Sequence, residues 1–479
     1  HSHHDYVLLL YNQAQSFIRQ GITSCVIGMC GESFAPIKPG NLDEIKEVFI
    51  RVSPLFGMID IKWNSFAEYL AEIEKFKTAI NVVPVVGYND IRLAGGQAHE
   101  NRPPTPEEYE NMKNYLTQSM EAGAFGMSTG LIYAPQVFAK TEELINLAKV
   151  MAKYNGIYFT HMRDEGRYVI EALKEAIEIV EESKCFGGQI SHAKISGRTF
   201  WGKSKEFIRL INEANERGIN ITCDQYPYNR GMSHLSVLLP PWVHEGGPEE
   251  TLERLKKSEI QERIKEELSK EIEGFENIIK NNGFERIYIT TTGTEQWKDI
   301  EGKSISEITK IKGKVDNWET LFDLLISEKL MTWVTLETMG EEDIRRIMTS
   351  RYQMFGTDGA GIPNLPSLGK YHPRLYGTYP RVLGKYVREE KVLTLEDAIR
   401  KMTSFPAQRL GFNDRGLLRE NMYADIVIFN PDTVIDTATF EDSHQFPDGI
   451  IHVIVNGTIV VENNKQNRRR PGKVLRRPN

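Results

Sequence analysis

Short apolar runs alternate with amphipathic segments along most of the chain. The strand-like runs lie at residues 23–30, 81–86, 125–128, 157–161, 189–192, 220–224 and 353–358. Helical periodicity predicts helices at residues 6–19, 106–121, 141–154, 168–183, 204–217 and 395–410. Strands and helices that alternate in this way are typical of a parallel sheet with helices packed outside it.

The number of strand-like runs favours a closed barrel. The seven runs end in polar residues, and an eighth would stand immediately before His1. We therefore predict an α/β fold, a (β/α)8 TIM-type barrel that lacks its N-terminal strand. We expect the seam left by that strand to stay open, with unpaired backbone groups that invite other chains.

Two segments depart from the barrel rhythm. Residues 229–350 form a long insertion between strands 7 and 8, with a charged helical part at 248–280 and a strand-like part at 286–292. Residues 413–479 carry β-patterned runs at 424–429 and 450–460, with turn signals at Asn430-Pro431 and Asn456-Gly457. We expect a barrel domain over 1–412, an insertion or lid at 229–350, and part of a small β domain over 413–479.

The composition excludes several classes of function. The 479 residues are 40% hydrophobic and 26% charged, and they contain no apolar run long enough to span a membrane. A net charge of −7 argues against nucleic acid as a partner. The basic residues near the C-terminus are more typical of a solvated tail than of a binding patch; they are Arg468 to Arg470, Lys473, Arg476 and Arg477.

The cysteine content indicates a reducing compartment. Four cysteines in a chain of this length make no disulfide framework, so we expect a cytoplasmic protein. The chain opens without Met, so a signal sequence upstream of His1 stays open as an alternative.

Candidate metal ligands stand at the start of the chain and at the ends of the strand-like runs. His1 and His3 are two positions apart, so on an extended strand both side chains point the same way. Cys30, His161, His192 and Asp358 each end a strand-like run, on the face where barrel active sites are built. Each of these residues alone is as readily structural, but together they predict a metal site.

The presence of a cysteine narrows the choice of metal. Zn²⁺ accepts Cys and His ligands, whereas Mg²⁺ and Ca²⁺ prefer oxygen. Cys30 would lie at the end of its strand and Cys25 deeper on the opposite face, so we favour Cys30 as the ligand and Cys25 as structural. Asp358 could be a turn residue, a metal ligand or the acceptor of a proton from the attacking water.

Several sequence blocks resemble those of one family, in the same order. They are GMSTGLIYAP (126–135), THMRDE (160–165), ISHAK (190–194), CDQYPY (223–228), GTDG (356–359), HPRLYGTYPRVLGKYVRE (372–389) and YADIVIFNP (423–431). The family is the D-aminoacylase (N-acyl-D-amino-acid deacylase) family of the amidohydrolase superfamily. The resemblance covers essentially the whole chain.

The resemblance implies a role for each candidate residue. Cys30, His161 and His192 would hold one tight zinc ion, and His1 and His3 a second, weaker position that Cys30 could bridge. Asp358 would be a metal ligand and the catalytic base, then the acid. The substrate-binding residues implied are Lys194, Tyr226 and Arg374 on the α-carboxylate and Tyr133 beside the scissile carbonyl.

The sequence also departs from the family pattern at two positions. Met232 stands where a small hydroxyl residue is expected in the carboxylate pocket, and Tyr88 stands where a histidine is common. These differences bear on substrate preference and leave the reaction class unchanged.

The resemblance implies zinc-dependent hydrolysis of N-acyl-D-amino acids to a carboxylate and a free D-amino acid. The partner expected is this small-molecule substrate, with no nucleic acid and no membrane, and the oligomeric state stays open. A metal-activated water would attack the amide carbonyl. One alternative is a cyclic-amide hydrolase of hydantoinase or dihydroorotase type, which shares the scaffold. Another is a truncated scaffold without catalytic activity.

Overall fold

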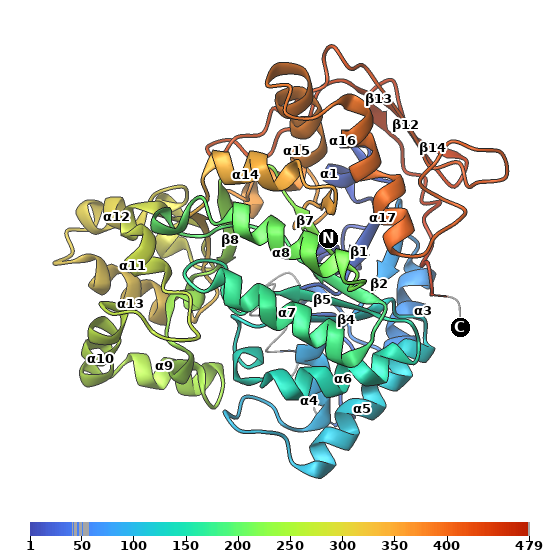
Figure 1. Cartoon of the computed structure of the whole chain (residues 1–479). Coiled ribbons are helices and arrows are strands. Elements are labelled where there is room, and N and C mark those ends of the chain that lie inside the picture. Colours follow the sequence, from blue (N-terminus) through green and yellow to red (C-terminus); the bar gives the residue numbers. More distant parts are fainter. Residues whose placement is uncertain (41, 43–45, 47–49, 51–56, 478–479) are drawn as a thin grey trace.

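The computed structural model describes all residues except 41, 43–45, 47–49, 51–56 and 478–479 (Figure 1). All seven strand-like runs form strands. Their bounds are β1 Ser24–Ile27, β2 Asn81–Pro84, β3 Val86–Gly87, β4 Gly126–Gly130, β5 Ile157–His161, β6 Gly187–Ile190, β7 Ile221–Gln225 and β11 Gln353–Phe355. β1 pairs with β2, and the other six pair in the order β11-β7-β6-β5-β4-β3. Every one of these pairings is parallel, and β2 and β3 belong to one run of chain.

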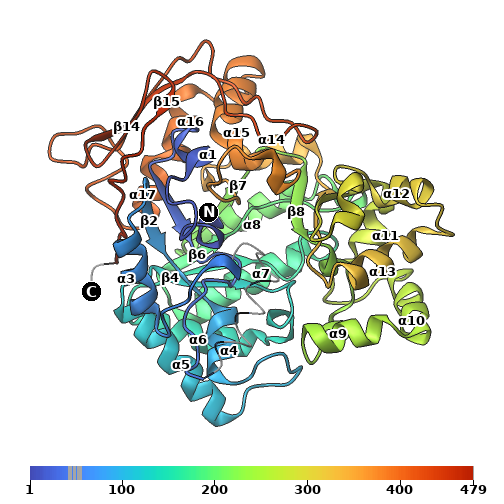
Figure 2. The same cartoon turned by 180° about the vertical axis from the view of Figure 1, so that it is seen from behind.

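The first three residues lie between the first and last strands of this array. The backbone N–H groups of Thr357 and Asp358 both donate to the carbonyl of His1, at 3.2 Å. On the other side the Ser2 hydroxyl donates to the carbonyl of Val26 at 2.6 Å. The segment therefore occupies the barrel wall at the seam, close to the middle of the molecule (Figure 2). His1 and Ser2 also line a cavity of about 820 Å³ that is bordered by both the barrel and the C-terminal sheet.

Helices cover the outside of the barrel, as the periodicity predicts. They are α3 Phe66–Phe76, α4 Tyr88–Gly95, α5 Pro106–Glu121, α6 Thr141–Ala152, α7 Val169–Ser183, α8 Ser204–Glu216, α14 Glu341–Met348 and α15 Arg374–Arg381. A π-helix at Val382–Glu389 continues α15. The start of α5 shows why the boundary is sharp: Thr105 and Glu108 form a capping box, and Pro106 stands at the first helical position.

The predicted helix at 6–19 is wrong over most of its length. A 3₁₀ turn covers His4–Tyr6, and the only α-helix in this stretch is α1 at Gln15–Ile18. Ala14, just before α1, adopts the left-handed conformation with φ of 43°. The carbonyl of Asn12 accepts from the backbone of Ala79 rather than from the next helical turn. Tertiary hydrogen bonds thus replace the helix that the apolar spacing favours.

The predicted helix at 395–410 is divided in two. α16 covers Leu395–Met402 and α17 covers Ser404–Arg409. Pro406 causes the break, because its ring would clash with the carbonyl of Met402 in a continuous helix. A proline fits within a first helical turn, so α17 begins just before it.

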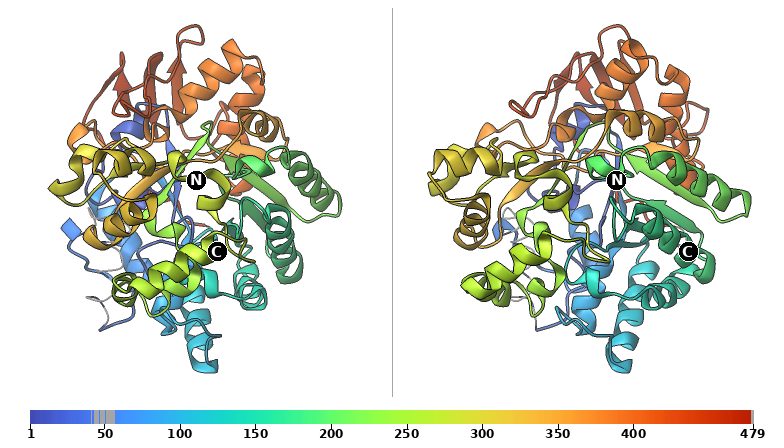
Figure 3. Two further views of the ribbon diagram at one scale, coloured as in Figure 1. Left: turned by 90° about the vertical axis from the view of Figure 1, so that its left-hand side faces the viewer. Right: turned by 60° about the vertical axis from the view of Figure 1, so that its left-hand side comes forward.

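The insertion forms a lobe with a hydrophobic core of its own. Its sheet is antiparallel in the order β8-β10-β9, with β8 at Arg230–His234, β10 at Trp333–Glu337 and β9 at Ile287–Thr291. β9 confirms the strand-like part at 286–292, and the helical part at 248–280 contains α9, α10 and the start of α11. The helices of the lobe are α9 Pro248–Leu255, α10 Ser258–Leu268, α11 Ile278–Asn282, α12 Ile305–Ile311 and α13 Asn317–Ser327. Figure 3 shows this lobe from the side on which it stands in front of the barrel.

The C-terminal region forms a four-stranded antiparallel sheet beside the barrel. Its strands are β12 Ile426–Phe429, β13 Ile450–Val455, β14 Thr458–Glu462 and β15 Lys465–Gln466. The predicted turn between β13 and β14 is present. Asn456 and Gly457 have φ of 47° and 77° there, the combination that a two-residue hairpin of type I′ requires.

The basic tail is packed against the barrel and is not a freely solvated segment. Val474 forms a parallel bridge with Val82, and the amide of Gly472 donates to the carbonyl of Thr78. The guanidinium of Arg477 lies over the ring of Phe186. Elsewhere, none of the helices in the described part of the chain has the length and apolar character needed to cross a membrane.

Candidate active site

The predicted metal ligands meet at the carboxyl ends of the barrel strands. Cys30 follows β1, His161 ends β5, His192 follows β6 and Asp358 follows β11. Cys30, His192 and Asp358 all adopt the left-handed backbone, with φ of 54°, 35° and 48°. Residues other than glycine are strained in that backbone region, and strained residues are found most often at functional sites. Here the unusual backbone turns three side chains toward one point.

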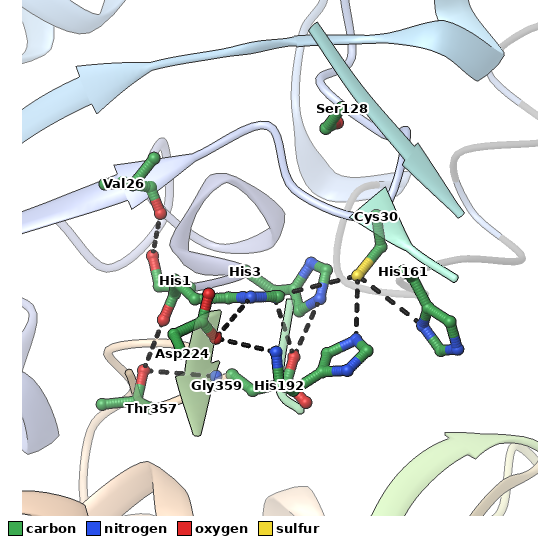
Figure 4. A network of polar contacts seen from close by, with 12 residues as sticks. His1, His3, Val26, Cys30, Ser128, His161, His192, Asp224, Thr357 and Gly359 are labelled. Atoms are coloured by element: carbon green, nitrogen blue, oxygen red, sulfur yellow. Dashed lines mark hydrogen bonds and ion pairs between the residues drawn. The ribbon is translucent and has the colours of Figure 1, made fainter. Parts of the chain in front are cut away.

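Cys30, His161 and His192 form an inner group (Figure 4). Their ligand atoms all lie within 4.8 Å of one another. The Cys30 Sγ is 3.5 Å from His192 Nε2 and 3.9 Å from His161 Nδ1. Tetrahedral zinc, with a Zn–S bond of about 2.3 Å and Zn–N bonds of about 2.0 Å, would place S and N about 3.5 Å apart. The residues present therefore fit a zinc ion.

His1, His3 and Asp358 form an outer group around the same thiol. His1 Nε2 lies 3.8 Å from Cys30 Sγ and 3.2 Å from Asp358 Oδ1. His3 Nε2 lies 3.3 Å from the same carboxylate oxygen. Because Cys30 belongs to both groups, its sulfur stands where it could bridge two metal positions.

The electrostatics of the site favour a thiolate at Cys30. Burial alone would raise the pKa of its thiol, but the His192 charge and hydrogen bonds from the surrounding imidazoles hold that pKa well below its ordinary value. Cys25 differs, because burial raises the pKa of its thiol to about 12. A thiolate is the form that binds metal, so Cys30 has the chemistry of a ligand and Cys25 does not.

Two carboxylates that sequence reasoning missed orient the histidines. Glu165 approaches His192 Nδ1 at 3.0 Å and His161 Nε2 at 3.3 Å. Asp224 approaches His1 Nδ1 at 3.1 Å and accepts from the backbone of His192 at 2.8 Å. A carboxylate on the far nitrogen commonly fixes the ring of a metal-binding histidine. The one sequence signal was their place in the blocks THMRDE and CDQYPY: Asp224 lies within β7, and Glu165 lies four residues after the end of β5.

The four predicted substrate residues line one cavity together with most of the metal ligands. This space is bordered by Tyr133, Lys194, Tyr226 and Arg374 and by all the predicted ligands except His1. Arg374 Nη1 is 2.6 Å from Asp358 Oδ2, and its Nε, although buried, has no hydrogen-bond partner among the described residues. Lys194 Nζ is 2.7 Å from Glu165. Two cations thus stand beside the metal ligands.

The two departures from the family pattern lie in different places. Met232 lines the cavity, next to Ser233, whose hydroxyl donates to the Tyr133 hydroxyl at 3.5 Å. Tyr88 is fully buried and donates to Glu143, and it is absent from the cavity lining. Of the two, Met232 is placed to contact a substrate and Tyr88 is not.

Comparison with known proteins gives consistent results. The model of the amidohydrolase family matches residues 273–461. The D-aminoacylase of Alcaligenes xylosoxydans xylosoxydans is 32% identical over 100% of this chain and 86% of its own length. The N-acyl-D-glutamate deacylase of the same organism is also 32% identical, over 100% of this chain and 85% of its own.

A solved structure is similar over nearly the whole chain. It is the N-acyl-D-glutamate deacylase of Bordetella bronchiseptica complexed with zinc and a phosphonate inhibitor, a mimic of the tetrahedral intermediate. The TM-score is 0.80 at 30% identity, covering 99% of this chain and 87% of that one.

The ligand geometry predicts which substitution removes the metal. Cys30→Ala should lose the tightly bound zinc, because the sulfur is common to both ligand groups, whereas His3→Ala should keep it. Cys25→Ala is the matched control, a buried cysteine of the same strand region outside both groups. Zinc per chain after dialysis, measured by mass spectrometry, checks this. A Cys30→Ala protein that retained one tight zinc would show that Cys30 is not the anchor.

Proposed function

The chain belongs to the amidohydrolase family, in the group of D-aminoacylases and N-acyl-D-amino-acid deacylases, and we propose that it hydrolyses N-acyl-D-amino acids to a carboxylate and a free D-amino acid. One observation carries the proposal. A zinc-adapted ligand set from three strands and a lysine–arginine pair border the same cavity. The first suits hydrolysis of an amide and the second suits the α-carboxylate next to it.

The inner group of Cys30, His161 and His192 would hold zinc tightly, since three protein ligands leave a fourth position open. His1, His3 and Asp358 would hold a second ion more weakly, sharing Cys30. When bound, zinc supplies Lewis acidity at the amide carbonyl and lowers the pKa of water toward neutral. Glu165 and Asp224 keep the imidazoles in the orientation that this requires.

Asp358 is the residue proposed to move the proton. Burial opposes its ionisation, but Arg374, His192 and His1 together hold the pKa of this carboxyl well below its ordinary value. It is therefore ionised at neutral pH and can accept a proton from the attacking water. The same oxygen can then return the proton to the departing amine, the usual exchange of base and acid roles.

The substrate would be oriented by its own charge. Arg374 offers a planar guanidinium fork and Lys194 a point charge, and both can donate to an α-carboxylate. The ring of Tyr226 lies 4.7 Å from the Arg374 guanidinium carbon and 5.9 Å from Lys194 Nζ, so it would separate the two cations and position them. Tyr133 would stand beside the scissile carbonyl. The insertion would act as a lid, since Trp333 and Leu336 of its sheet border the cavity.

The lysine–arginine pair favours a linear substrate over a cyclic amide. A ring substrate without a free α-carboxylate would leave the buried Nε of Arg374 without a hydrogen-bond acceptor among the described residues, which is costly. The complete ligand set argues against a scaffold that has lost its activity. The test is hydrolysis by the zinc-loaded protein of N-acetyl-D-methionine, N-acetyl-L-methionine and a D-hydantoin. Faster hydrolysis of the D-amide than of the other two compounds supports the proposal, and faster hydrolysis of the hydantoin contradicts it. If none of the three compounds is hydrolysed, a scaffold without catalytic activity is favoured.

The proposed proton transfer predicts the effect of removing one charge. Asp358→Asn keeps the size of the side chain, and we expect kcat to fall by at least about 10²-fold while the tight zinc remains. Asp397→Asn, a surface change on α16, is the control. A kcat for Asp358→Asn within a factor of about two of the parent would contradict a role in proton transfer.

The proposed carboxylate contact predicts a change in binding. Arg374→Lys retains the charge but loses the two-pronged contact, so we expect KM to rise by at least about 10-fold with a smaller change in kcat. An N-acyl amine without the α-carboxylate should be a poor substrate for the parent and nearly unaffected by the substitution. If the parent cleaved both substrates equally well, Arg374 would not bind the carboxylate.

A further inference from the structure

The walls of the substrate cavity carry apolar side chains and carboxyl groups, but few cations. The apolar part consists of Ile132, Met232, Val237, Ile278, Trp333 and Leu336. Among the described residues that line this cavity, Lys194 and Arg374 are the only lysine or arginine. In the proposed function both bind the α-carboxylate, so no cation remains for a second negative charge on the substrate.

Two glutamates occupy the walls where a substrate side chain could extend. Glu276 comes from the insertion and accepts from the backbone amide of Glu165 at 3.0 Å. Glu32 comes from the barrel and accepts from the Tyr6 hydroxyl at 2.6 Å. Burial raises the pKa of each carboxyl to about 7. Whether ionised or protonated, neither group can neutralise a substrate carboxylate.

The cavity continues into a space whose described lining contains no lysine or arginine. A second compartment of about 130 Å³ shares Glu32, Ile132 and Val237 with the first. Further along, its wall includes the apolar Pro135, Val137 and Leu239, and also polar residues such as His234 and His244. Burial lowers the pKa of these two histidines to about 3 and about 4, so both are uncharged at neutral pH. A side chain or acyl group that extends in this direction would meet no lysine or arginine of the described residues, and a buried charge without a partner is costly.

The next arginine is already occupied. Arg163 borders a narrow adjoining space beside Glu276. Its guanidinium forms a salt bridge with Glu175 at 2.9 Å and donates to the carbonyls of Val137 and Ala139 at 3.0 Å. Its charge is therefore already paired with a carboxylate and is not free to neutralise an acidic substrate.

We propose that this site selects N-acyl-D-amino acids with neutral side chains and rejects the D-glutamate and D-aspartate derivatives. The selection rests on the proposed function and narrows its substrate class. Overall similarity does not decide the matter, because the D-aminoacylase and the N-acyl-D-glutamate deacylase compared above are equally similar to this chain. The decisive feature is local: the cavity that meets the side chain provides carboxyl groups and no spare cation.

The test compares two substrates that differ only in charge. N-acetyl-D-glutamine and N-acetyl-D-glutamate have nearly the same shape, and we expect kcat/KM of the zinc-loaded enzyme to be at least about 10²-fold higher for the glutamine derivative. Equal values, or a higher value for the glutamate derivative, would overturn the proposal.

Substitutions locate the selectivity. Glu276→Gln preserves an acceptor for the Glu165 amide. We expect it to lower the ratio of kcat/KM for the glutamine derivative to kcat/KM for the glutamate derivative by about 5-fold or more. Glu32→Gln should lower this ratio as well. Glu273→Gln, an exposed position in the same segment, removes an equal charge outside the cavity and should leave the ratio unchanged. If the parent enzyme shows a large ratio and none of the three substitutions changes it, the two glutamates do not contribute. The absence of a free lysine or arginine alone would then account for the preference for the neutral substrate.

A binding measurement separates this proposal from the proposed function. Calorimetry with zinc-loaded Asp358→Asn protein should give a Kd for N-acetyl-D-glutamine at least about 10-fold below that for N-acetyl-D-glutamate. If the parent enzyme hydrolyses neither of these compounds nor N-acetyl-D-methionine, the proposed function fails, but the two Kd values still decide the selectivity. A Kd for the glutamate derivative equal to or below that for the glutamine derivative would overturn it.

Discussion

The approach of the Cys30 sulfur to the His192 imidazole, at 3.5 Å, is the contact on which the site depends. The two residues are 162 positions apart in the sequence and follow different strands of the parallel array. They can meet only if the sheet curves far enough to bring β1 opposite β6. The barrel therefore does more than support the site, because its curvature sets the distance between the ligands. The left-handed backbone at Cys30, His192 and Asp358 adds the final turn toward a common point.

Pairing of opposite charges stabilises the buried metal ligands and substrate-binding residues. The thiolate and the carboxylates Glu165, Asp224 and Asp358 face the histidines, Lys194 and Arg374. Buried charges are tolerated when each has a partner, and here the partners are shared between the metal ligands and the substrate residues. Lys194 binds Glu165, which in turn orients both histidines of the inner group. A substrate carboxylate that binds Lys194 would therefore contact the same hydrogen-bond network, through Glu165, that orients His161 and His192.

Strand order and strand ends could be predicted from the sequence, because both follow from local patterns. Every apolar run became a strand, and Cys30, His161, His192 and Asp358 took their expected places at strand ends. The failures have physical causes that a local pattern does not contain. Where a helix was expected at 6–19, Asn12 accepts a tertiary backbone hydrogen bond from Ala79 instead of one from the next helical turn, and Pro406 divides the helix expected at 395–410. Glu165 and Asp224 stand in blocks that carry the family resemblance, but the sequence does not show that they contact histidine nitrogens, and the fold alone reveals that contact.

The central claim is that zinc is held by residues from separate strands, with the Cys30 sulfur as the shared ligand. A crystal structure of the zinc-loaded protein, with anomalous data collected at the zinc edge, tests it most directly. The account predicts a strong anomalous peak about 2.3 Å from Cys30 Sγ and about 2.0 Å from a nitrogen of both His161 and His192. A zinc ion bound with Cys30 outside coordination distance, or held by a different set of residues, would contradict it.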